Sequence, residues 1–229
     1  PMPHWLDFFC YTMFVDRDGK FQLGMLSTSA FKPLAASMGP MLKEESFHLG
    51  TGSNGLRRII KAGVIPLDML QRYINKWVST AHDLFGVDAS SSAHWAYVWG
   101  IKGRWDERKK LDSGIEVNKE TLNEESRGHY HDEIVFEVEK LSKYLPEGST
   151  KLYVPHENFN RDIGSAKGQR FTTDGDVFVG SDEDWENYLY DVLPRSQDEE
   201  DLKELFKQEW IANKPMSARQ IESRIGASI

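Results

Sequence analysis

The chain has 229 residues, of which 39% are apolar and 28% are charged, so it can bury one substantial core and has the composition of a soluble globular protein. Its formal net charge of -8 excludes a generic nucleic-acid-binding surface, and its single cysteine, Cys10, excludes an internal disulfide and a thiolate metal site. Because no apolar run is long enough to span a bilayer and no signal peptide precedes the first helix, we expect a cytoplasmic protein that contacts no membrane.

Apolar residues recur at helical spacing through the first part of the chain, and we predict long helices over residues 4–28, 32–62 and 67–85. Gly19 leaves open the alternative that the first helix is two shorter segments, and Gly39-Pro40 predicts a kink near the start of the second. Because Pro1 leads at once into an apolar helix, we favour the interpretation that residues are missing upstream.

The rest of the chain predicts a smaller and more mixed region. The aromatic segment 94–100 fits neither helix nor strand clearly, and residues 119–144 are predicted to be helical. Residues 150–180 have an irregular, strand-like pattern with a turn at Asp174-Gly175-Asp176, and short helices are predicted over 185–193 and 198–210 before a loose tail. We therefore divide the chain into a bundle domain, residues 1–88, and a helical and irregular C-terminal region, residues 89–229.

The pattern Glu45-Ser46-Phe47-His48 is a Glu-x-x-His motif inside a predicted long helix. Residues three apart lie on one helix face, so both side chains can reach one metal ion. Asp16 in the preceding helix supplies a carboxylate, and a carboxylate facing Glu-x-x-His across two antiparallel helices is half of a bundle di-iron site. The alternative for Asp16 is a charged turn, because residues 16–20 read Asp-Arg-Asp-Gly-Lys.

Two stretches around these residues, Phe14 to Leu23 and Met41 to His48, resemble the third and fourth bundle helices of the benzoyl-CoA epoxidase family. The resemblance continues through His129-Tyr130-His131 and reaches about residue 195, and it includes these further segments: Lys151 to Pro155, Phe159 to Gly164, and Asp174-Gly175. It implies a mainly α fold, with half of a ferritin-like four-helix bundle followed by additional helices and a small irregular, β-containing C-terminal region.

The same resemblance implies a function. The family uses a pair of iron ions and dioxygen to epoxidise the aromatic ring of benzoyl-CoA, with electrons from an NADPH-dependent flavin and iron–sulfur reductase. It implies that Asp16, Glu45 and His48 are iron ligands, with Glu45 as the bridging, catalytic carboxylate. An aryl group bound near the iron needs an apolar wall, for which we expect Phe8, Phe9, Tyr11 and Phe47.

This sequence departs from the family pattern because it contains no second Glu-x-x-His motif. Either an N-terminal half lies outside this chain, which we favour, or a second subunit of the same chain completes the site. Three functions therefore remain open at this point. They are a di-iron monooxygenase acting on benzoyl-CoA or a related aryl-CoA, an iron-binding or ferroxidase protein whose site forms between two chains, and a non-catalytic helical interaction module.

One further motif, the His129-Tyr130-His131-Asp132-Glu133 segment, has side chains of metal-binding type. Its position at the start of a predicted helix favours a solvated helix end instead, and we expect no metal there.

Overall fold

The computed structural model describes residues 4–104 and 120–206 of the chain. Contacts divide the chain into a large unit, residues 1–194, and a small unit, residues 195–229. The division predicted near residue 88 lies inside the large unit and stays a prediction. The smaller unit contains helix α8, Ser196–Phe206, whose first turn is acidic.

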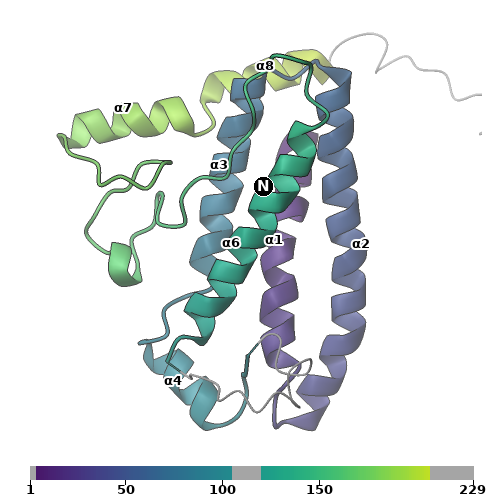
Figure 1. Ribbon diagram of the computed structural model, residues 1–229, viewed down its shortest axis with the longest axis vertical. Helices are drawn as coiled ribbons and strands as arrows, with labels where there is room; N and C mark the ends of the chain where they lie inside the picture. Colours follow the sequence, from purple (N-terminus) through teal and green to yellow (C-terminus); the bar gives the residue numbers. More distant parts are fainter. Residues whose placement is uncertain (1–3, 105–119, 207–229) are drawn as a thin grey trace, which may run out of the picture. The chain divides into compact units, whose positions relative to one another are not determined.

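The large unit is helical, as predicted, and its principal helices are α1, Trp5–Leu26, α2, Lys32–Ala62, α3, Leu67–Leu84, and α6, Leu122–Ser142. These four lie side by side, with α2 along one edge and α1 next to it (Figure 1). The short connections between α1, α2 and α3 make consecutive helices antiparallel. The mainly α fold expected from the sequence is therefore confirmed.

Two alternatives left by the sequence are settled by α1. Helix α1 continues through Gly19, so the Asp-Arg-Asp-Gly-Lys stretch is helical rather than a charged turn. Helix α2 is continuous through Pro40, and the kink expected there stays a prediction. The helix ends at Ala62, before Gly63, whose positive φ of 65° suits a glycine C-cap.

Helix α1 is the centre of the core. Thirteen of its 22 residues are buried, whereas only five of the 31 residues of α2 are buried. Helices α2, α3 and α6 all contact α1, which explains why its polar residues Arg17 and Asp18 are buried together with Phe14. Helix α2 therefore packs on one side only and leaves a wide face open.

The remaining elements of the large unit connect and cover these helices. The aromatic segment that the sequence did not assign is helical, forming α4, Ser91–Val98. Between α6 and helix α7, Asp182–Val192, the chain is irregular and includes a short 3-10 turn, Gly164–Ala166. In the described ranges, the strand-like pattern yields only one isolated antiparallel bridge, Phe171 to Val177. The turn between these residues brings together one residue pair rather than two extended strands. The expected β content is therefore smaller than the pattern indicated.

Candidate metal centre

Three side chains from α1 and α2 come together as the sequence predicted. Asp16, Glu45 and His48 each offer a ligand atom, and these atoms lie within 4.8 Å of one another. His48 Nδ1 is 3.6 Å from Asp16 Oδ2 and 3.6 Å from Glu45 Oε2. These separations exceed hydrogen-bond length and are close to the roughly 3–3.5 Å between ligand atoms that share one first-row metal ion at about 2.1 Å.

Two glycines of α2 allow the helices to approach closely enough for this arrangement. An ideal Cβ on Gly52 would lie 2.5 Å from the backbone nitrogen of Met13, and one on Gly55 would lie 2.2 Å from the Phe9 ring. No side chain fits at either position without moving α1. Gly52 follows His48 by about one helical turn, so the closest backbone contact lies beside the cluster.

The electrostatics of the cluster are those of an incompletely neutralised pair of carboxylates. The pKa of Asp16 is raised from 3.8 to about 6, mainly by burial and also by the neighbouring charge of Glu45, while His48 opposes the rise. Burial also raises the pKa of Glu45, although the nearby His48 opposes this effect. A cation placed between the two carboxylates would remove the repulsion.

One oxygen of the cluster lacks the partner that a buried carboxylate requires. Glu45 Oε2 is buried and accepts no hydrogen bond. A buried carboxylate oxygen without a donor is costly, and metal coordination is one of the few ways to satisfy it. Two hard carboxylates and an imidazole are also the ligand types that iron accepts, so these residues fit a divalent iron ion.

The aromatic residues expected to form a substrate wall are dispersed. Phe8 and Phe9 cluster with Trp5 near the start of α1, and Phe47 is 66% exposed. Tyr11 packs edge-on against Trp77 of α3. Burial raises the pKa of Tyr11, and the charges of Asp16 and Glu45 add to the effect, so Tyr11 lies within electrostatic range of the cluster. The assignment of all four to substrate binding stays a prediction.

The segment from His129 to Glu133 was expected to be a solvated helix start, and this is right only for its exposed residues His129 and Asp132. The other three side chains face the protein. Tyr130 is fully buried and donates a hydrogen bond to the carbonyl oxygen of Phe14 in α1. His131 Nδ1 lies 3.3 Å from Nε2 of His82, which is itself 1% exposed. Glu133 forms ion pairs with Arg17 and Lys20 of α1. These residues therefore hold α6 against α1 and α3, and their side chains face inward because α6 packs on that side.

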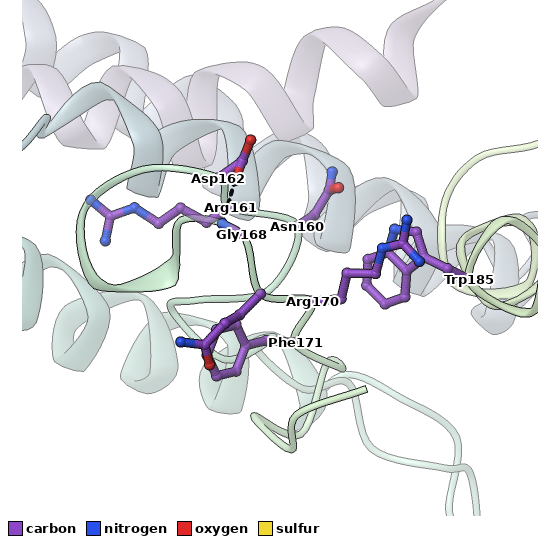
Figure 2. Close-up of a pocket in the computed structure, with 8 residues that line it drawn as sticks. Asn160, Arg161, Asp162, Gly168, Arg170, Phe171 and Trp185 are labelled. Atoms are coloured by element: carbon purple, nitrogen blue, oxygen red, sulfur yellow. Dashed lines mark hydrogen bonds between the residues drawn. The ribbon is translucent and has the colours of Figure 1, made fainter. Parts of the chain in front are cut away.

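A separate hollow of about 510 Å³ lies between the irregular segment and α7, and its lining includes Asn160, Arg161, Arg170 and Trp185. Figure 2 shows the Arg170 side chain beside the Trp185 ring, while Arg161 points away from them. Arg170 is paired with Asp182 at 2.6 Å, and Arg161 with Asp83 at 3.2 Å. Both cations are therefore already neutralised, which favours a structural role for this region.

Comparison with known proteins identifies a family and a relative to which this chain is similar. The sequence profile of the phenylacetic acid catabolic protein family matches residues 1–164. The chain is also 32% identical to "Benzoyl-CoA oxygenase component B" of Aromatoleum evansii, over 237 aligned positions that cover 86% of this chain and 50% of the relative. The chain thus spans about half the length of that relative. No helix in the part of the chain that the structure describes is long and apolar enough to cross a membrane.

Proposed function

The chain belongs to the phenylacetic acid catabolic protein family, and from this premise we propose that it forms one half of a di-iron monooxygenase. In this proposal the substrate is benzoyl-CoA or a related aryl-CoA, and the reaction is epoxidation of the aromatic ring with dioxygen. Electrons come from a separate NADPH-dependent flavin and iron–sulfur reductase. The name of the relative supports the substrate class, and the cluster of Asp16, Glu45 and His48 supports the chemistry.

The observation that carries the proposal is that the cluster has the right ligands but too few of them. Asp16, Glu45 and His48 are the one group of this kind in residues 4–104 and 120–206. A bundle di-iron site takes carboxylates from two helices and Glu-x-x-His from two others, so three residues amount to half of it. The other half comes from a segment outside this chain, in agreement with its coverage of only 50% of the relative.

Iron bound at such a site supplies the activation of dioxygen for transfer of one oxygen atom to the substrate. The residues of this chain hold the cations and set their surroundings. Asp16 and Glu45 would provide negative charge, and Glu45 Oε2, which has no hydrogen-bond donor, would be available as a ligand atom. With a pKa of about 6, Asp16 is mostly ionised at neutral pH and so binds a cation without first losing a proton.

The proposal is tested by removing ligands one at a time. In the complete enzyme, Glu45→Ala or His48→Ala should lower iron affinity by at least about 100-fold and abolish product formation from benzoyl-CoA, because a ligand matters more than the outer groups that already contribute 10–100-fold. Glu44→Ala is the matched control. Glu44 is exposed and points about 100° around α2 from Glu45, so iron content and turnover should be retained.

Iron analysis of the 229-residue chain distinguishes the remaining alternatives. We expect well under two irons per chain, because both ions would be under-coordinated. Two irons bound per dimer would instead favour the ferroxidase or storage protein formed between two copies. No iron bound by the chain or its dimer would favour the non-catalytic helical interaction module. Full retention of iron and turnover in Glu45→Ala and His48→Ala would refute the assignment of these residues as iron ligands.

A further inference from the structure

The side of α1 that faces Glu45 carries a glycine where a larger residue would touch the carboxylate. An ideal Cβ on Gly19 would lie 3.3 Å from Glu45 Oε1 and 3.5 Å from Glu45 Cδ. Gly19 follows Asp16 by three residues, so the two share one face of α1. Helix α1 therefore presents a carboxylate and then, one turn later, a bare Cα toward the same Glu45 side chain.

Backbone geometry does not explain this glycine. Gly19 is in the interior of α1 and is absent from the residues with positive φ, so any residue can adopt its conformation. Glycine inside a helix costs about 1 kcal/mol relative to alanine. Tight contact between backbones does not explain it either, because the three atoms nearest to its ideal Cβ all belong to the Glu45 carboxyl group. What the glycine leaves open is space for that carboxylate.

We propose that Gly19 is a positioning residue for the metal centre: its lack of a side chain lets the Glu45 carboxylate lie against α1 beside Asp16, where both reach the same ion. The inference rests on the proposed function. A methyl group at this position leaves a contact tight enough that Glu45 must give by a few tenths of an ångström. Metal sites tolerate such shifts poorly because ligand distances vary by only about 0.2 Å.

Two measurements with opposite expected signs separate positioning from packing. In Gly19→Ala the added helix propensity should leave the metal-free chain equally stable or more stable, while the displaced carboxylate weakens metal binding. We expect the affinity for Co²⁺, which stands in for Fe²⁺ in such ligand sets, to fall by about 10-fold, as for other groups that orient a ligand. If Gly19 were needed only for helix packing, Gly19→Ala would instead lower the stability of the metal-free protein.

Gly50→Ala and Gly128→Ala are the controls, because nothing lies within 4 Å of a Cβ at either position and both are inside helices. Co²⁺ titration and the metal-free Tm are measured on the complete enzyme, because the 229-residue chain alone supplies only half of the site. The proteins compared are wild type, the two controls, Gly19→Ala and Glu45→Ala. Unchanged Co²⁺ affinity in Gly19→Ala, or an equal loss in the controls, overturns the inference while leaving the metal site standing. A folded wild type that binds Co²⁺ no better than Glu45→Ala overturns both the inference and the proposed function.

Discussion

The two sides of α1 handle polar groups in opposite ways. Toward α3 and α6, the buried polar side chains have partners within the protein: Arg17 pairs with Glu133, and His82 Nε2 contacts His131, although His82 Nδ1 makes no hydrogen bond. Toward α2, the side chains of Asp16, Glu45 and His48 lie close together without hydrogen bonds between them, and His48 is 56% exposed. We refer to these as the closed side and the open side of α1.

The difference shows that burial alone does not separate a functional cluster from a structural one. Arg17 and His82 are more deeply buried than Glu45, yet each has a protein partner that accounts for its position. Glu45 is less buried, and the contact of its Oε2 with His48 Nδ1, at 3.6 Å, is too long for a hydrogen bond. A buried polar atom without a hydrogen bond, such as His82 Nδ1, does not by itself indicate a missing ligand. Glu45 Oε2 does so because Asp16 and His48 also bring ligand atoms to it.

The largest expected effect tests whether the closed side carries the stability of the chain. Phe14 is fully buried on α1, whereas Phe47 on α2 is 66% exposed. Phe14→Ala should cost about 3–5 kcal/mol of unfolding free energy, and Phe47→Ala should change it by less than about 0.5 kcal/mol. Urea denaturation of both variants measures the difference. Equal losses would mean that the outward face of α2 is covered in solution.

An intermediate effect tests how the open side is held together. Gly52→Ala places a methyl group 2.5 Å from the backbone of Met13, so the helices must separate, at a cost of about 1–3 kcal/mol. Gly50→Ala meets nothing within 4 Å and should stabilise the chain by up to about 1 kcal/mol. The sign of the change in Tm distinguishes the two. A rise in Tm for both variants would show that α1 and α2 lie further apart than the glycine contacts indicate.

The helices and the three members of the cluster were predictable because both rest on local periodicity. Apolar spacing places α1, α2 and α3 within a few residues, and the i, i+3 spacing of Glu45 and His48 survives any packing of α2. Asp16 required the antiparallel pairing as well, which the short connection makes almost unavoidable.

What the sequence did not predict depends on contacts between distant residues. His131 and Glu133 were expected to face solvent, and only the position of α6 against α1 and α3 turns them inward. The space at Gly19 and the close approach at Gly52 depend on how α1 and α2 pack together. In the sequence alone, each glycine indicates only a reduced helix propensity. The β pattern failed because strand-like residues need a neighbouring strand, and the described part of residues 150–180 supplies one bridge.

The smallest expected effect is a difference in how the two sides respond to acid. On the closed side, burial lowers the pKa of His82 well below its ordinary value of 6.5, and the charges of His131 and Arg127 lower it further. Burial also lowers the pKa of His131, against the opposing charge of Glu157. The unfolded chain therefore binds protons near pH 6.5 that the folded chain does not, and stability should fall as the pH drops below about 6.5.

The open side has the opposite sign, because the pKa of Asp16 is raised from 3.8 to about 6. The folded chain holds this proton when the unfolded chain has lost it, so the contribution of Asp16 to stability is present at low pH and is lost as the pH rises through about 6.

Between pH 7 and pH 5, His131→Gln should therefore show a smaller drop in Tm than wild type, because it removes one imidazole that resists protonation. Asp16→Asn should show a larger drop, because it removes the group that gains from acid. Metal-free protein is needed for the comparison, since a bound cation would hold Asp16 ionised and hide its titration. Identical pH profiles in the three proteins would mean that neither cluster changes its protonation on folding, and the contrast between the closed and open sides would then be one of geometry alone.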